Sequence, residues 1–272
     1  MIDSSEEPSG PQDGAWNHPY ILSSGETQYH ELSHTRLWVT LLDKEWQVRS
    51  ERTPQSVDRI RWEQTTQYVL PGAEATLQRF IRRDDNNTVT YLPALARLPT
   101  VIRPYQPLTI PAAGECTIYV GTLLWMRICV GERKTELVEL PLADPSMTWV
   151  GRNTMEGDLC YSAPSYARLV LEAVPKRPWR AITPVRIVNR RDDALLLERF
   201  SLPTPLLSLY INDKGLLWTP GVTVVCETDM NSARLKVDGK VPEVAGSCQL
   251  LSPAREKSER GGLIRAFDRM FG

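Results

Sequence analysis

Apolar and polar positions group along the chain into short runs of strand length. From residue 184 to residue 228 the runs PVRIVN, ALLLERFSLP, TPLLSLYI, LLWT and VTVVCET follow one another, with RRDD and NDKG between them. Runs rich in Val, Ile, Leu, Tyr and Trp that are cut about every 8 to 12 residues by Asn, Asp, Gly or Pro are typical of antiparallel strands. This segment therefore predicts a β-sandwich or a β-barrel.

The first half of the chain carries the same pattern. LWVTLL and WQVRS are separated by the charged residues Asp43, Lys44 and Glu45, which predicts a hairpin. Four prolines between residues 99 and 111 exclude a helix there and favour edge strands or extended connections. Two more strands are expected at residues 135–140 and 167–174, and the whole chain is predicted to be all-β.

The distribution of prolines and charges divides the chain into segments. The Pro-containing joint PKRPWR, residues 175–180, predicts a boundary between two sandwich-like antiparallel β domains, residues 18–175 and 180–252. Residues 1–17 are polar and Pro/Gly-rich and predict a disordered tail. Residues 253–272 predict a charged linker followed by a short amphipathic helix.

Composition sets limits on the class of protein. The 272 residues are 42% apolar and 24% charged, which suits one large globular domain or two ordinary ones. A net charge of -1 gives no general attraction to nucleic acid, so no nucleic-acid partner is expected. The polar, acidic start predicts no secretory signal and a cytoplasmic location. Five scattered cysteines without a CxxC pair indicate reduced thiols that serve as small hydrophobic groups.

One string resembles a catalytic motif. HELSH, residues 30–34, matches the H-E-x-x-H pattern of zinc peptidases. On a helix His30 and His34 lie one turn apart and share a zinc ion, while Glu31 activates the metal-bound water. The flanks TQY and TRLWVTLL favour a strand, on which the two histidines lie about 13 Å apart, four steps of about 3.3 Å, and cannot bind one ion. We expect surface histidines on an early strand; a zinc peptidase using His30, Glu31 and His34 is the alternative.

The rest of the chain offers few catalytic groups. All three histidines lie within the first 34 residues, the third being His18, so the later chain lacks the commonest general base. No G-x-S-x-G elbow, phosphate loop or dinucleotide fingerprint is present. We therefore expect binding rather than catalysis, with no cofactor.

Two segments are candidate binding sites. The stretch MTWVGRNTMEGDLCYS, residues 147–162, predicts a long loop in which aromatic and polar groups converge, either as a recognition loop for a partner or small ligand or as an ordinary connection. Its candidate binding residues are Trp149, Arg152, Asn153, Glu156, Asp158 and Tyr161. KRPWR, residues 176–180, surrounds Trp179 with two arginines and a lysine, a set able to stack a base or clamp a phosphate. We expect instead that Trp179 fills the seam between domains with those basic groups in water.

The C-terminal helix is the third candidate interaction site. Its predicted apolar face consists of Leu263, Ile264, Phe267, Met270 and Phe271. A helix of about ten residues is marginal in water, so this face must dock on its own body, in a partner's groove or on a membrane surface. Contact with a membrane is at most peripheral, because two Arg and one Asp attract lipid headgroups weakly.

Several segments together carry a family resemblance. The runs LPTVIRPYQPLTIPAAGECTIYVGTLLW, TWVGRNTMEGDLCY and RAITPVRIVNRRDDALLLERFSLPTPLLSLYINDKGLLWT are similar to the prokaryotic domain-of-unknown-function family 432, over roughly residues 20–252. The family implies no catalytic residue. It implies an accessory or regulatory protein at the inner face of the membrane, with a small mechanosensitive channel as protein partner.

Overall fold

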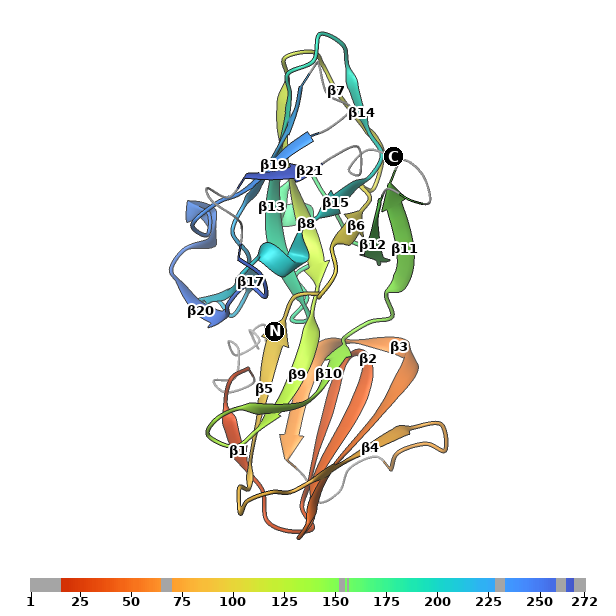
Figure 1. Cartoon of the computed structure of the whole chain (residues 1–272), viewed down its shortest axis with the longest axis vertical. Coiled ribbons are helices and arrows are strands. Elements are labelled where there is room, and N and C mark those ends of the chain that lie inside the picture. The colour runs from red at the N-terminus through yellow and green to blue at the C-terminus, as the bar shows by residue number, and fades with distance from the viewer. Residues whose placement is uncertain are drawn as a thin grey trace, which may run out of the picture.

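The computed structural model shows an all-β protein (Figure 1). It describes residues 16–64, 70–151, 155, 157–227, 233–257 and 263–266, with only the backbone described for residues 55–64 and 263–266. Within these residues the helices are three 3-10 turns of three residues each, η1 (Leu171–Ala173), η2 (Thr204–Leu206) and η3 (Glu243–Ala245). No helix in this part of the chain has the length and apolar character needed to cross a membrane.

Two sheets form the lower part of the molecule in Figure 1. The first has four antiparallel strands in the order β1 (Pro19–Ile21), β5 (Thr88–Ala94), β9 (Trp125–Val130), β10 (Thr135–Pro141). The second has three antiparallel strands in the order β2 (Thr27–Leu41), β3 (Glu45–Gln64), β4 (Thr76–Ile81). The expected hairpin around Asp43 is confirmed, because Leu41 of β2 pairs with Trp46 of β3.

Strand β2 changes its inward face at a bulge. Leu32 lies in the core, and so do Leu37, Val39 and Leu41, although an unbroken two-residue period from Leu32 would place even-numbered residues there. The register against β3 shifts on both sides of Ser33, whose φ is 52°. The bulge at Ser33 therefore exchanges the two faces of β2.

The upper part of the molecule contains the larger sheet. Its eight strands are β8 (Glu115–Leu123), β13 (Arg180–Asn189), β16 (Leu209–Asn212), β17 (Leu217–Trp218), β18 (Val222–Cys226), β19 (Ala233–Val237), β20 (Cys248–Ser252) and β21 (Leu263–Ala266). β13 runs parallel to both β17 and β18, so the prediction of purely antiparallel domains is wrong here. The long excursion through the intervening strands supplies the crossover that parallel pairing requires.

Two smaller sheets flank this large one. A four-stranded sheet has the order β11 (Ser146–Gly151), β12 (Gly157–Ser162), β6 (Thr100–Ile102), β15 (Phe200–Leu202). A two-stranded ribbon joins β7 (Leu108–Ile110) to β14 (Leu195–Leu197). Strands from both sides of the predicted boundary at residues 175–180 therefore share sheets.

The longest pairing across that boundary joins β8 to β13. The register runs from Arg180 opposite Leu123 to Val188 opposite Glu115. A domain that began at Arg180 would thus have in its main sheet strand β8, which comes from the other side of the predicted boundary. The division into residues 18–175 and 180–252, and the description of each as a sandwich, stay predictions.

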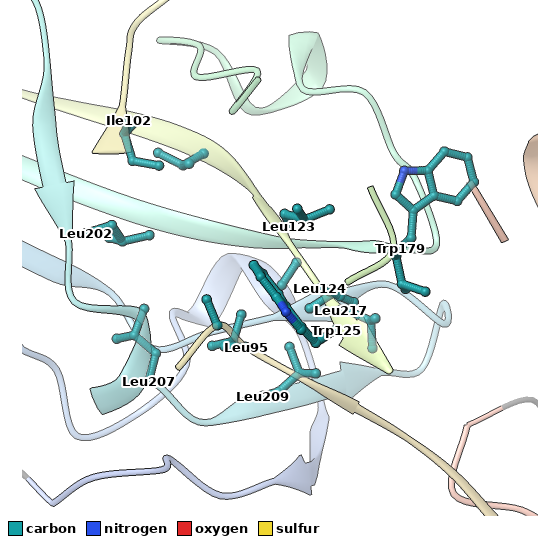
Figure 2. Close-up of a cluster of buried hydrophobic side chains, with 14 of the residues drawn as sticks. Leu95, Ile102, Leu123, Leu124, Trp125, Trp179, Leu202, Leu207, Leu209 and Leu217 are labelled. Atoms are coloured by element: carbon teal, nitrogen blue, oxygen red, sulfur yellow. The ribbon is translucent and has the colours of Figure 1, made fainter. Parts of the chain in front are cut away.

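One hydrophobic core connects both parts of the molecule. Figure 2 shows Trp125 packed among leucines from several strands, with Trp179 at one end of the cluster. The side chain of Trp179 is 1% exposed, and its carbonyl accepts a hydrogen bond from the Leu124 N–H at 3.3 Å. Trp179 therefore packs at the point where the chain passes from β8 to β9; that this point is a seam between two domains stays a prediction.

The ends of the chain differ from expectation where the structure describes them. Of the predicted disordered segment 1–17, Trp16 packs against the core and the Asn17 N–H donates to the Tyr91 carbonyl at 2.9 Å; residues 1–15 lie outside the described residues. Both are held because they lie beside β5. Burial and backbone pairing override the polar composition at these two positions.

The predicted C-terminal linker is also bound to the body. The Arg255 Nε–H donates to the Leu95 carbonyl at 2.7 Å, and its Nη2 pairs with Glu139. Residues 263–266 form strand β21, antiparallel to β19, instead of the expected helix. A short helix is marginal in water, whereas the edge of β19 offers a full set of backbone partners.

Candidate functional site

The HELSH residues lie on strand β2, as the flanking sequence predicts. His30 packs edge-on against Tyr91 of β5, with ring centroids 4.4 Å apart. His34 lies beyond the bulge at Ser33, and its Nδ1 is 3.0 Å from the Thr53 carbonyl oxygen. The one-turn spacing on which the zinc motif depends is therefore absent from β2. Within the described residues, no group of three or more His, Cys, Asp or Glu side chains is arranged to hold a metal.

His30 is a core residue rather than the surface residue expected from the sequence. It is 0% exposed and packs between Tyr20 and Tyr91. Burial disfavours the charged imidazolium and lowers the pKa of His30 to about 3. The side chain is therefore neutral throughout the physiological pH range.

Glu31 belongs to a separate ionic network on β2 and β3. It accepts hydrogen bonds from the Tyr29 hydroxyl and from Arg36 Nε, the latter at 3.1 Å. Arg36 Nη1 also pairs with Glu51 at 3.2 Å, and the Gly72 N–H donates to the other oxygen of Glu51 at 2.9 Å. This network fixes both carboxylates, so Glu31 acts as a structural ion-pair partner.

A cleft of about 350 Å³ opens beside this network, between β2, β3, β4 and β10. Two of its charged residues have partners: Glu51 is held by Arg36, and Arg52 pairs with Asp144 at 2.9 Å and donates to the Pro141 carbonyl at 2.8 Å. Residues along its wall are Thr35, Ser50, Glu51, Arg52, Glu74, Thr76 and Leu140. Because Glu51 and Arg52 are paired within the protein, we interpret the cleft as a structural contact between these strands rather than as a ligand-binding site.

Residues 146–151 and 157–162 form the two paired strands of a hairpin rather than the expected loop. β11 and β12 pair in register from Ser146 opposite Ser162 to Gly151 opposite Gly157. The alternation of β-branched, aromatic and aliphatic residues along both segments suits strands, but the glycines and charges at the tip obscured it. Val150 and Cys160 face inward and pack with Val101 of β6.

The outer face of the hairpin is apolar. Trp149 lies opposite Leu159, and Met147 lies opposite Tyr161, so the four side chains share one face. Trp149 is 46% exposed, Leu159 is 43% exposed and Met147 is 62% exposed. Tyr161 is half-buried and packs on Trp125 at 5.1 Å between ring centroids. We call Met147, Trp149, Leu159 and Tyr161 the hairpin stripe; Tyr161 anchors it to the core.

Gly157 allows the indole of Trp149 to lie close to the backbone of β12. A Cβ at Gly157 would lie 2.6 Å from the indole of Trp149 and 2.7 Å from the Val150 carbonyl oxygen. Both separations are shorter than any real Cβ contact, so a side chain here displaces the indole or the backbone.

Gly157→Ala is therefore expected to lower the free energy of unfolding by about 1–3 kcal/mol, because overpacking forces the hairpin apart. Denaturant unfolding measures the loss, and tryptophan fluorescence reports the displaced Trp149. Gly239→Ala is the matched control, since its Cβ would meet nothing within 4 Å and the change should stay within about 0.5 kcal/mol. Equal stability of the two variants would show that Trp149 does not rest on Gly157.

The other predicted binding residues lie on β12, on β21 or outside the described residues. Asp158 lies on β12 next to the tip, on the same face as Val150 and opposite to that of Trp149. Arg152, Asn153 and Glu156 lie outside the described residues, as do Phe267, Met270 and Phe271 of the predicted tail face. Leu263 and Ile264 are placed by the backbone of β21 alone. Of the described members of the predicted loop site, Trp149 and Tyr161 therefore share one face of the hairpin and Asp158 lies on the other.

The basic cluster around Trp179 was identified from the sequence, but its arginines are less exposed than expected. Lys176 is exposed, as expected, but Arg177 is half-buried and Arg180 is only 7% exposed. The KRPWR string showed three cations around a tryptophan, yet nothing in it showed that one of them turns inward.

Comparison with known proteins assigns the chain to a family and to nothing more specific. Comparison with the curated proteins gave no match, and neither did comparison with the solved structures. A family model matches residues 16–271, nearly the whole chain. The chain belongs to the family described as "Protein of unknown function (DUF432)".

Proposed function

We propose that this protein is a non-enzymatic accessory or regulatory protein that binds a protein partner through the hairpin stripe. We further propose that it acts in the cytoplasm, built from two sandwich-like β bodies, and that the partner is a small mechanosensitive channel at the inner face of the membrane. The observation that carries the proposal is the row of exposed apolar side chains on β11 and β12.

The stripe has the composition of a binding surface. Aromatic residues and methionine are enriched in protein interfaces, and exposed tryptophan is a frequent hot spot. Trp149 rests on the glycine at position 157 and so presents its ring at low entropic cost. A rigid aromatic beside Met147 and Leu159 favours an apolar partner surface over a charged one.

The backbone of β11 supplies a second binding element. β11 is the outer strand of its sheet and, among the described strands, pairs only with β12 (Figure 1). Its free edge can accept an extended segment of the partner as an added strand, with main-chain hydrogen bonds giving affinity. Met147 and Trp149, which alternate along this strand, then select apolar side chains at every second partner position.

Binding to a purified small mechanosensitive channel from the same genome tests the proposal. Trp149→Ala is expected to weaken binding by about 30-fold or more, the effect of removing a hot spot worth about 2 kcal/mol. Ile81→Ala is the matched control, because Ile81 is 85% exposed on β4, away from the hairpin, and its loss should leave binding unchanged. Calorimetry in detergent gives both affinities.

The outcomes separate the two parts of the proposal. Absence of binding by the wild-type protein overturns the channel as partner. Binding that Trp149→Ala and Ile81→Ala leave equally strong overturns the hairpin stripe as the surface.

A further inference from the structure

A tight turn brings two arginines together at the start of β13. The Arg180 N–H donates to the Arg177 carbonyl at 3.0 Å and closes a turn around Pro178 and Trp179. Proline favours this geometry because its φ is fixed, and the buried indole of Trp179 anchors the turn in the core. The backbone of this turn thus brings the two arginine side chains close to each other.

Tyr166 holds both guanidinium groups. The Cζ atoms of Arg180 and Arg177 lie 4.6 Å and 4.9 Å from the centroid of its ring, and Arg177 Nη1 donates to its hydroxyl at 3.2 Å. Gly121 of β8 permits this close packing, since a Cβ there would lie 3.2 Å from the Ser165 carbonyl oxygen. The Gly121 carbonyl accepts a hydrogen bond from Arg180 Nη1 at 2.6 Å.

The positive charges of this cluster are not neutralised by any carboxylate of the described residues. Neither Lys176, Arg177 nor Arg180 forms an ion pair with a carboxylate of the described residues, although Arg180 is 7% exposed. Arg180 Nε is buried and has no hydrogen-bond acceptor among the described residues. Burial, together with the charge of Arg177, lowers the pKa of Arg180 to about 10. A buried arginine is ordinarily paired, so this one lacks its counter-charge.

A recess lies at this place in the fold. The three cationic residues line it together with Gly121 and apolar side chains from β13 and β17. Its volume is about 10 Å³, room for one water-sized group. One oxygen of a ligand can therefore enter the recess, while the rest of the ligand stays outside it.

We propose that this recess binds a phosphate group, either free or at the end of a larger molecule. Three positive charges without a carboxylate favour a dianion over a single carboxylate, and guanidinium groups form charge-assisted, directional hydrogen bonds to phosphate oxygens. The apolar wall lowers the local dielectric and strengthens these interactions. The residues that line the recess include none of the hairpin stripe, and the site goes beyond the proposed protein-binding function.

Titration calorimetry of the full chain with inorganic phosphate, at constant ionic strength set by chloride, tests the proposal. Saturable binding is expected for the wild-type protein, and binding about ten-fold weaker or more is expected for Arg177→Gln and for Lys176→Gln. Arg83→Gln is the matched control, because it removes one exposed arginine from the connection between β4 and β5 in the lower part of the molecule and should bind as the wild type does. Circular dichroism confirms that each variant is folded; Lys176 is exposed, so its variant keeps the test valid if Arg177→Gln unfolds.

Further titrations, with methyl phosphate and with acetate, identify the source of the ligand. Methyl phosphate that binds as tightly as inorganic phosphate supports a phosphate ester with its organic part outside the recess. Phosphate that binds more tightly than methyl phosphate supports the free ion. Acetate that binds as tightly as phosphate, or the same non-saturable response in all four proteins, would overturn the proposal.

Discussion

Trp179→Ala is expected to lower the free energy of unfolding by about 3–5 kcal/mol, the usual loss when a large buried aromatic is truncated. Trp179 is 1% exposed and belongs to the core that connects both parts of the molecule. Its removal leaves a cavity at the junction between β8 and β9 and loosens the turn that places Arg177 and Arg180. Urea denaturation followed by circular dichroism measures the loss.

Trp149→Ala is the matched control for this prediction. The same chemical change at a side chain that is 46% exposed should cost less than about 1 kcal/mol, because little packing is lost. Equal losses in the two variants would contradict the assignment of Trp179 to the core.

His30→Leu is expected to remove a large part of the pH dependence of stability. The folded protein holds His30 neutral down to a pKa of about 3, whereas in the unfolded chain a histidine takes up a proton near pH 6.5. Below that pH the unfolded state binds more protons, so stability falls as the pH falls from about 6.5 to about 3. By pH 5 the loss due to His30 is about 2 kcal/mol.

Urea denaturation of wild type and His30→Leu between pH 4 and pH 8 tests this prediction. The difference between the two free energies of unfolding should be constant above about pH 7 and should change by about 2 kcal/mol between there and pH 5, with the wild type losing more. His18→Leu, which replaces an exposed histidine, is the control and should follow the wild-type curve. Parallel curves for wild type and His30→Leu would refute the buried, neutral state of His30.

The sequence predicts local features of the fold well. The all-β class, the β2–β3 hairpin and strand β10 follow from short-range alternation and turn residues, and the structure contains all three. Residues 167–174 were predicted as a strand but include the 3-10 turn Leu171–Ala173. Isolated apolar positions do not show whether a neighbouring strand is available for pairing.

Other features depend on contacts that a single sequence does not record. The pairing of β8 with β13 joins segments about sixty residues apart, and no local signal encodes it. The bulge at Ser33 exchanges the faces of β2, so that His30 shares the buried face of Leu32, and no local signal in the sequence shows this. The inward turn of Arg180 likewise depends on Tyr166 and Gly121, both distant in the chain.

A single residue, Leu124, separates β8 of the upper sheet from β9 of the lower sheet (Figure 1). Leu124 is 0% exposed; its N–H donates to the Trp179 carbonyl, and its own carbonyl accepts from the Leu142 N–H at 3.0 Å. These two hydrogen bonds fix the backbone at Leu124, so the upper and lower parts of the molecule cannot rotate about this residue while the bonds are present. A change in the angle between the two parts at this point would therefore break one or both of these backbone hydrogen bonds.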